Sequence, residues 1–252
     1  MIRAAAILLT WAVLSAQAAA ETVVAGLSRD AISITTNFEG SEILIFGAVS
    51  RTAPPPPDSE LHVIVTVEGP PRPVTVRRKA RRFGIWVNTD AIEVDAAPTF
   101  YAVASTAGFA TVMTATEDLR RRVSIPTAIR AVGTNVGDQD SFIQALVRIR
   151  TAAELYQFNE GGVTLRDQTL FDTSIRLPAN LVEGDYRTRI FLTRDGEVID
   201  ALSQNITVRK VGLERWIYNL AHDQPLAYGI LSLAIAIAAG WLASAVFRYL
   251  RG

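Results

Sequence analysis

The chain has 252 residues, of which 49% are hydrophobic, with 25 basic and 25 acidic side chains and no cysteine. The lack of cysteine excludes disulfide bonds, thiol chemistry, zinc–thiolate sites and iron–sulfur clusters. When Arg3, Arg248 and Arg251 are set aside with the apolar ends, 22 basic residues remain against 25 acidic ones. This balance gives no global reason to expect binding to nucleic acid or to anionic lipid.

Residues 1–20 have the composition of a cleaved signal peptide. Arg3 supplies the positive charge, Ala4–Leu14 is apolar, and small residues at its end suit cleavage after Ala18 or Ala20. The alternative is an N-terminal membrane anchor, which needs about 20 apolar residues and is longer than this run. We therefore expect the chain that follows to be exported.

Residues 21–112 are predicted to form a β-sandwich lobe of immunoglobulin type. Their pattern is mostly of period 2, with apolar or β-branched runs bounded by turn residues. Four consecutive prolines, Pro54–Pro57, form a connection that no central strand could contain. The expected strands are Ala31–Thr35, Glu42–Val49, Leu61–Glu68, Val74–Arg78, Phe83–Asn88 and Phe100–Ser105.

Residues 113–208 are predicted to contain a helical segment followed by more strands. Helical periodicity indicates a helix over Asp138–Tyr156 and a shorter one over Thr116–Arg122. Either this region is a second β lobe that divides from the first near residue 112, or one sandwich carries a helical insertion. The fold class is mainly β in both cases. The expected strands are Leu170–Leu177, Tyr186–Arg194 and Glu197–Val208, with a hairpin turn at Asp195-Gly196 and a tyrosine corner at Tyr186.

The C-terminal part is predicted to attach the chain to a membrane. Residues 226–247 carry no charge and are long enough, at about 1.5 Å per residue, to cross a hydrocarbon core of about 30 Å. Arg248 and Arg251 follow at once, and basic residues beside a span stay in the cytoplasm. Residues 248–252 are therefore expected to be a cytoplasmic tail, and the signal peptide gives the same orientation for the rest of the chain.

Residues 209–225 are predicted to form a juxtamembrane amphipathic helix. Leu213, Trp216, Ile217 and Leu220 fall on one helical face, and Trp216 with Tyr218 suits the level of the lipid headgroups. The alternative is an ordinary amphipathic helix that packs on the β domain.

Catalytic and cofactor motifs are absent from the sequence. The two histidines, His62 and His222, have no partner at metal-ligand spacing, and no nucleophile elbow, Walker loop, GxGxxG or HExxH occurs. The carboxylates are scattered and do not define a pair suited to glycoside hydrolysis. We expect no enzymatic activity, no cofactor and no metal site.

The densest unusual feature is a basic run between residues 72 and 82. Arginine side chains suit carboxylate, phosphate or sulfonate-like groups, so the run is a candidate contact for an anion or an acidic partner. The alternative is a solvated strand edge whose charges discourage edge-to-edge pairing. The six cations are Arg72, Arg77, Arg78, Lys79, Arg81 and Arg82.

A stripe of small side chains runs along the expected membrane helix. Small residues allow close approach of helices in lipid, so this stripe is a candidate packing surface. An alanine-rich span also produces such stripes by chance. The stripe consists of Ser232, Ala236, Gly240 and Ser244.

Several short segments, taken together, carry a family resemblance. They are Asn37-Phe38-Glu39-Gly40, Ile45-Phe46-Gly47-Ala48, Glu68-Gly69-Pro70-Pro71 with Arg77-Arg78-Lys79, Gly84-Ile85-Trp86-Val87-Asn88, Pro98-Thr99-Phe100-Tyr101-Ala102, and Tyr228-Gly229 with Gly240-Trp241-Leu242 and Phe247-Arg248. From about residue 22 to its end the chain resembles a family of uncharacterised alphaproteobacterial single-pass transmembrane proteins. The resemblance implies a membrane topology and, through genes near permeases of the TauE/SafE type, a transporter partner. It supplies no catalytic residues.

These observations predict a bacterial inner-membrane protein with a periplasmic β domain that acts as an accessory or interaction protein for a transporter or permease. The alternative is a tethered periplasmic module that binds a ligand or senses the envelope. A tail of about five residues is too short for a cytoplasmic signalling domain, which favours the first hypothesis.

Overall fold

The computed structural model describes residues 21–251 apart from 36–37, 55–58, 132–137 and 212. The predicted signal peptide and most of the four-proline connection lie outside the described residues. The chain divides into two compact units. The first contains the residues up to Ile32 and Glu39–Val208, and the second contains Ser33–Phe38 with Arg209 onward.

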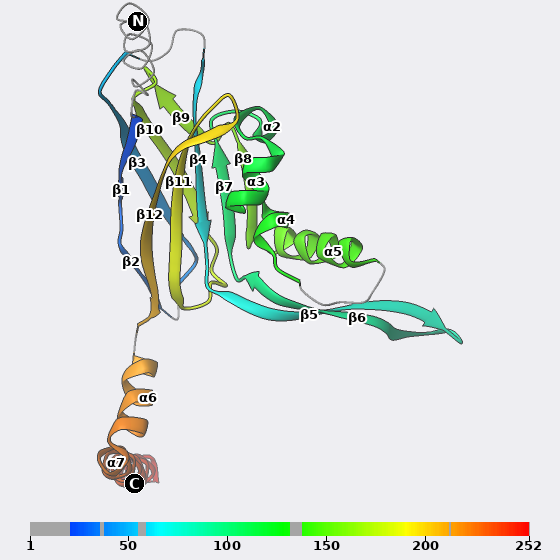
Figure 1. The fold of residues 1–252 in the computed structure, drawn as a ribbon. Coiled ribbons are helices and arrows are strands. Elements are labelled where there is room, and N and C mark those ends of the chain that lie inside the picture. The colour runs from blue at the N-terminus through cyan, green and yellow to red at the C-terminus, as the bar shows by residue number, and fades with distance from the viewer. Residues whose placement is uncertain (1–20, 36–37, 55–58, 132–137, 212, 252) are drawn as a thin grey trace, which may run out of the picture. The chain divides into compact units, whose positions relative to one another are not determined.

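The first unit is built from two sheets and one long hairpin (Figure 1). The four-stranded sheet is antiparallel in the order β1-β3-β10-β9. The six-stranded sheet has the order β2-β12-β11-β4-β7-β8, and its β8 runs parallel to β7. The strands are β1 (Glu21–Leu27), β2 (Ala31–Ile34), β3 (Ser41–Arg51), β4 (Leu61–Glu68), β5 (Pro71–Arg82), β6 (Ile85–Pro98), β7 (Tyr101–Ser105), β8 (Tyr156–Glu160), β9 (Val163–Arg166), β10 (Leu170–Leu177), β11 (Gly184–Arg194) and β12 (Glu197–Lys210).

Four helices lie between β7 and β8 in the chain and cover one face of the six-stranded sheet (Figure 1). Strand β4 is buried along almost its whole length, because this sheet has the four-stranded sheet on one face and the helices on the other. Both sheets combine strands from before and after residue 112, so the segments on either side of it fold together. The helices are α2 (Phe109–Val112), α3 (Ala115–Arg121), α4 (Ile125–Ala128) and α5 (Gln139–Ala152).

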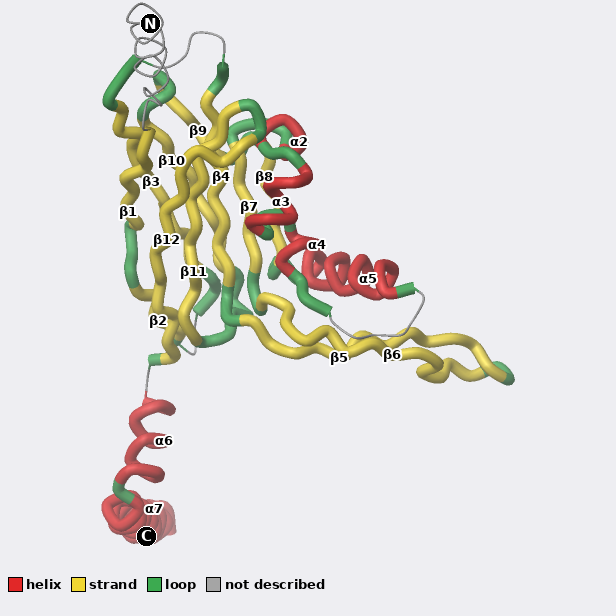
Figure 2. Tube along the Cα trace, in the orientation of Figure 1, coloured by secondary structure: helices red, strands yellow, loops and turns green. Residues whose placement is uncertain are grey.

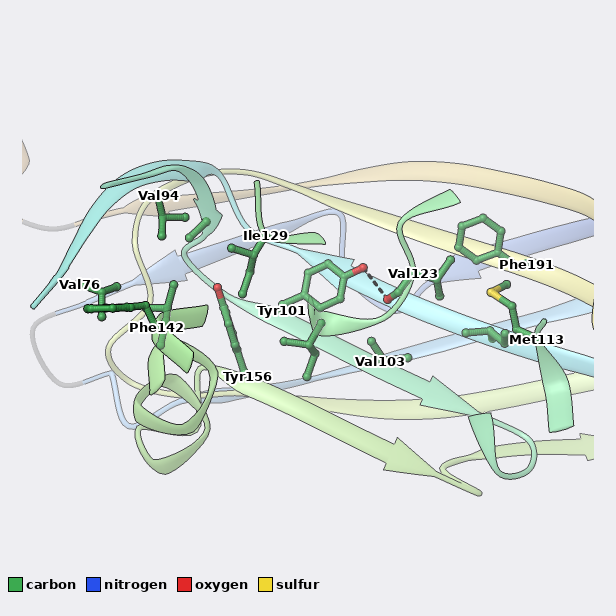
Figure 3. Packing of buried hydrophobic residues seen from close by; sticks show 14 of the residues in the cluster. Val76, Val94, Tyr101, Val103, Met113, Val123, Ile129, Phe142, Tyr156 and Phe191 are labelled. Carbon is green, nitrogen blue, oxygen red and sulfur yellow. Dashed lines mark hydrogen bonds between the residues drawn. The ribbon is translucent and has the colours of Figure 1, made fainter. Parts of the chain in front are cut away.

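A hydrophobic cluster joins the sheet, the helices and the base of the hairpin (Figure 3). Tyr101 lies in its centre and is fully buried, and its hydroxyl donates a hydrogen bond of 2.8 Å to the carbonyl oxygen of Val123. The hydroxyl of Tyr156 is satisfied in the same way by the carbonyl oxygen of Pro98, at 2.8 Å. Buried hydroxyls need such partners, because an unsatisfied polar group costs about 1–3 kcal/mol.

The mainly β fold class is confirmed, and several elements match in detail. Strands Leu61–Glu68 and Leu170–Leu177 have the predicted bounds. The predicted turn at Asp195-Gly196 has positive φ angles of 50° and 76° at its two residues. The tyrosine corner is confirmed, since the hydroxyl of Tyr186 donates a hydrogen bond of 2.8 Å to the carbonyl oxygen of Val182.

Three predicted elements are wrong in extent. The strand predicted over Val74–Arg78 runs from Pro71 to Arg82. Phe83 and Gly84 form a turn with φ angles of 48° and 87°, so the strand predicted from Phe83 to Asn88 begins at Ile85 and runs on to Pro98. The predicted helix over Asp138–Tyr156 ends at Ala152, because Glu154 adopts a φ angle of 59° and Tyr156 begins β8. The periodicity of the sequence did not predict β1, β8, β9 or the one-turn helices α2 and α4.

The second unit contains α6 (Leu213–Asp223) and α7 (Pro225–Arg251). On α6 the side chains of Trp216, Ile217 and Tyr218 are exposed. Within the described residues, one helix is long and apolar enough to span a membrane: Pro225–Arg248, with 24 residues and a mean hydropathy of 2.2. At about 1.5 Å per residue it is about 36 Å long, which exceeds a hydrocarbon core of about 30 Å.

A buried ion cluster joins the two sheets of the first unit. Arg194 of β11 donates two hydrogen bonds to the carboxylate of Glu21 on β1, at 2.8 and 2.9 Å, and their side chains are 9% and 4% exposed. Arg51 of β3 donates a third at 2.7 Å. Arg194 also donates to the carbonyl oxygen of Ser59 at 2.6 Å. The hydrogen bonds from Arg194, together with the one from Arg51, hold the pKa of Glu21 below its usual value.

Breaking this cluster should destabilise the fold strongly. Arg194→Met removes two of the three hydrogen bonds that Glu21 accepts from arginine and leaves its carboxylate buried. We therefore expect a loss of about 3–5 kcal/mol in unfolding free energy at pH 7. The control is Arg187→Met, which breaks a pair between Glu68 and an Arg187 that is 55% exposed, and should cost under about 1 kcal/mol. Chemical denaturation measures both.

The same cluster predicts that the free energy of unfolding decreases at low pH. Because the pKa of Glu21 is lower in the folded chain than its usual value of 4.5, its contribution is complete above that value and is lost as the pH falls through the folded pKa. Arg194→Met should therefore reduce the dependence of stability on pH below about 4.5. If wild type and variant lose the same unfolding free energy on acidification, the role assigned to the Glu21–Arg194 pair is contradicted.

Candidate interaction site

The β5–β6 hairpin is a continuation of two central strands beyond the sheet. β4 and β7 pair antiparallel, and the chain passes from β4 into β5 and from β6 into β7. The junction is closed by hydrogen bonds from the Gly69 amide to the carbonyl oxygen of Phe100 (2.8 Å) and from the Thr99 amide to that of Pro70 (3.1 Å). Figures 1 and 2 show the hairpin extending away from both sheets, with strand almost to its turn.

The turn of the hairpin is set by two residues in the left-handed region. Phe83 has a φ of 48° and Gly84 a φ of 87°, the arrangement that a type I′ turn needs. A side chain at Gly84 would meet nothing within 4 Å, so the glycine serves the backbone conformation and not a close approach.

The inner half of the hairpin packs on the helical layer. Val76, Ile92 and Val94 are buried in the hydrophobic cluster with Phe142 of α5. Ala96 and Arg130 exchange two backbone hydrogen bonds of 3.1 and 2.8 Å. These contacts support a two-stranded ribbon, which is marginal in water by itself.

Arg78 is the polar part of this support. Its guanidinium lies 4.4 Å from the ring centroid of Phe142 and donates hydrogen bonds to Asp138 Oδ2 at 2.6 Å and Ser141 Oγ at 2.5 Å. The hydrogen bond from Arg78 holds the pKa of Asp138 below its usual value. Arg78 is therefore occupied at the hairpin base, although the sequence placed it with five other candidate contacts.

The remaining cations of the basic run are exposed. Arg77, Lys79 and Arg81 alternate onto one face, and the residues opposite them on β6 are Ala91, Asn88 and Trp86, none of them acidic. Among the described residues, none of these three cations forms an ion pair, and neither does Arg82 near the turn. Arg72 lies at the base of the hairpin, opposite Ala97.

Charge is distributed unevenly along the hairpin. The inner half holds Arg72, Arg77 and Arg78, but it also holds the three acidic residues of β6, Asp90, Glu93 and Asp95. The ten residues nearest the turn, 79–88, include three cations and no acidic residue, and we use outer half for this segment and inner half for the rest of the hairpin. The unbalanced positive charge is therefore concentrated in the outer half, which sequence density alone did not reveal.

The small-residue stripe lies within α7, the helix on which it was predicted. Ser232, Ala236, Gly240 and Ser244 are exposed, and a side chain at Gly240 would meet nothing within 4 Å outside its own helix. The stripe is thus open to a neighbour in the part of the chain that the structure describes. Its packing role stays a prediction.

Two recesses in the first unit bear on ligand binding. One of about 210 Å³ is lined by His62, Thr106 and Gln168, among others, and His62 Nδ1 lies 3.1 Å from Thr106 Oγ1. The other, of about 440 Å³, is lined by Glu39, Glu42, Glu154 and Arg176 with neighbouring backbone. Among the described residues, no group of three or more His, Cys, Asp or Glu side chains is placed to hold a metal ion.

Removing the Arg78 anchor should loosen the hairpin base. Arg78→Ala loses a cation–π contact and two hydrogen bonds at a site that is 44% exposed, so we expect a cost of about 1 kcal/mol. Amide exchange in β5 and at the start of α5 should accelerate. The matched control is Arg77→Ala on the opposite face, which should change stability by less than about 0.5 kcal/mol. Equal exchange rates in the two variants would contradict the anchoring role.

The fold and α7 define a class: a membrane protein with a mainly β domain and one candidate spanning helix near its C-terminal end. A family model described as "Putative transmembrane protein (Alph_Pro_TM)" matches residues 22–249, and the chain belongs to this family. The match confirms the family resemblance drawn from the short segments.

Other comparisons add little. No curated protein matches the chain. One similar solved structure is the crystal structure of Spo0M, a sporulation control protein from Bacillus subtilis, with 10% identity, coverage of 80% of this chain and 53% of that chain, and a TM-score of 0.28. The chain thus spans about half the length of that protein, and so distant a likeness carries no argument.

Proposed function

We propose that this chain is a membrane-tethered periplasmic accessory protein that contacts an integral membrane partner, in the first place a transporter. The observation that carries the proposal is the β5–β6 hairpin, which presents unpaired cations well away from the sheets while its base is anchored by Arg78. An arm of this kind suits contact with an acidic surface, because exposed arginine and lysine side chains bind carboxylates and steer association. The family supports the membrane part of the proposal.

The proposed topology places the β domain in the periplasm and the C-terminus in the cytoplasm. It rests on the signal peptide in residues 1–20 and on Arg248 and Arg251 after the span. The exposed Trp216 and Tyr218 of α6 suit the headgroup level of the inner membrane. The tethered domain needs no enzymatic activity for this role, and we propose none.

Reporter fusions test this topology. Alkaline phosphatase is active in the periplasm, so a fusion after Val208 should be active and a fusion after Gly252 inactive. The reverse pattern would overturn the assigned orientation and, with it, the periplasmic role.

Reversing the exposed charge of the hairpin should release the partner. Lys79→Glu with Arg81→Glu should abolish co-purification of a membrane protein with the full chain from mild detergent, while the melting temperature stays nearly unchanged. Surface charge substitutions usually cost within about 0.5 kcal/mol. The matched control is Arg122→Glu with Arg148→Glu, which makes the same change of charge at exposed positions outside the hairpin.

Retention of the partner by the hairpin variant would remove the hairpin from the contact. Absence of any stoichiometric partner with the wild-type chain, under several mild detergents, would reject the accessory role.

The small-residue stripe of α7 gives a second, separable contact. Close approach through small side chains is a common route to helix association in lipid, where no hydrophobic force drives helices together. Gly240→Leu should weaken crosslinking of α7 to a partner helix or to itself, while insertion continues because leucine favours the bilayer. Equal crosslinking of wild type and variant would show that α7 anchors the chain without packing on another helix through this stripe.

The alternative function is a tethered ligand-binding or envelope-sensing module, and one observation favours it. Gln168 Oε1 is buried at the recess beside His62 and has no hydrogen-bond partner among the described residues. The recess, at about 210 Å³, is below the range of about 300–1,000 Å³ usual for small-molecule sites. Because the free atom of Gln168 is an acceptor, a thermal shift of the purified chain with small hydrogen-bond donors such as polyols would support this function, and Gln168→Ala should remove that shift.

A further inference from the structure

The turn of the hairpin exposes three large apolar side chains. Phe83 is fully exposed, and Ile85 and Trp86 are 65% and 67% exposed. Ile85 pairs with Arg82 and Trp86 with Arg81, so a cation lies opposite each of them. We call Arg81, Arg82, Phe83, Ile85 and Trp86 the hairpin tip.

The hairpin tip has the composition of a membrane-interface anchor. Aromatic rings and aliphatic side chains flanked by arginine or lysine are favoured at the headgroup level, where the rings enter the acyl boundary and the cations meet phosphate. The acidic residues of β6 lie in the inner half of the hairpin, so no carboxylate near the turn opposes such contact. The slightly acidic balance of the whole domain does not describe this local surface.

We propose that the hairpin tip inserts into the interface of a lipid bilayer and is a second membrane contact besides α7. This inference goes beyond the proposed function, because it requires no protein partner. Since α7 gives the chain a membrane anchor, a bilayer surface is present at high effective concentration. Anionic headgroups would add attraction for Arg81 and Arg82.

The small apolar area of the hairpin tip favours lipid over protein as its binding partner. Two aromatic rings bury about 150–250 Å² each, so with one isoleucine the tip offers about 500 Å². A specific protein interface of standard size takes about 800 Å² from each partner. Three side chains at a turn are therefore a small protein epitope, whereas a lipid interface sets no minimum area.

The backbone limits the depth of insertion. Unpaired amide and carbonyl groups on open strand edges are not tolerated in hydrocarbon. Near the turn both edges of the hairpin are open, since β5 and β6 pair there only with each other, whereas the edge of β6 is covered at Ala96 by the bridge to Arg130. The tip therefore enters only at the turn, and the strands stay at the headgroups or in water.

The experiment uses the full chain in proteoliposomes that contain no other protein. Because the chain has no cysteine, Ile85→Cys carries a unique polarity-sensitive fluorophore, and Ala201→Cys on the exposed side of β12 carries the control label. We expect a blue-shifted emission and quenching by headgroup-labelled nitroxide lipid at position 85, and neither at position 201. Vesicles of phosphatidylcholine alone and with phosphatidylglycerol separate apolar insertion from attraction to anionic headgroups.

Two variants make the test specific. Phe83→Ser with Trp86→Ser should abolish the lipid quenching at position 85, whereas Leu44→Ser with Leu170→Ser, which removes two exposed apolar side chains from the four-stranded sheet, should leave it unchanged. If the label at position 85 stays as water-exposed as the label at position 201 in both lipid mixtures, the proposal is overturned and the tip is left for a protein partner. Co-purification of a transporter is measured separately, so failure of either proposal is distinguishable from failure of the other.

Discussion

The direction of the β5–β6 hairpin depends on how the ribbon is held over its inner half. A ribbon of two strands cannot bury its own side chains, and without support it would not keep one direction. The support comes from Val76, Ile92 and Val94 in the hydrophobic cluster and from Arg78, which lies over Phe142 and binds Asp138 and Ser141. Because these contacts stop near the middle of the hairpin, the inner half is fixed and the outer half is free to meet a partner.

The two sheets of the first unit give the β5–β6 hairpin a well-packed starting point. β4 and β7 lie within the six-stranded sheet, and β4 is buried between the other sheet and the helices, so the hairpin starts from well-packed strands. The buried cluster of Glu21, Arg51 and Arg194 joins the two sheets at the start of β1. Because the hairpin continues directly from these packed strands, its position relative to the two sheets is well defined.

Much of the fold could be predicted from the sequence, because period-2 patterns and turn residues act locally. Leu170–Leu177, the turn at Asp195-Gly196 and the corner at Tyr186 are examples. The hairpin was underestimated because Phe83 is a strand-forming residue by composition, and a φ of 48° at a phenylalanine is not expected without the glycine that follows it. β8 was missed because its parallel pairing with β7 depends on a segment more than fifty residues away.

The candidate site was predicted as a region but not as a set of roles. The sequence identified the six cations of the basic run as candidate contacts. It could not show that Arg78 is occupied by α5, because Asp138, Ser141 and Phe142 lie about sixty residues further along the chain. It also missed the apolar tip, although Phe83, Ile85 and Trp86 beside Arg81 and Arg82 were a visible signal.

The most direct test of the central claim is site-specific photocrosslinking in intact cells. A photoreactive amino acid is placed at Lys79 or Ile85 in the outer half of the hairpin, or at Ala201 on the sheet as a control. We expect position 79 to crosslink to a membrane protein, position 85 to crosslink to lipid, and position 201 to give neither. Crosslinks at position 201 with none at either hairpin position would contradict the assignment of the hairpin as the contact arm.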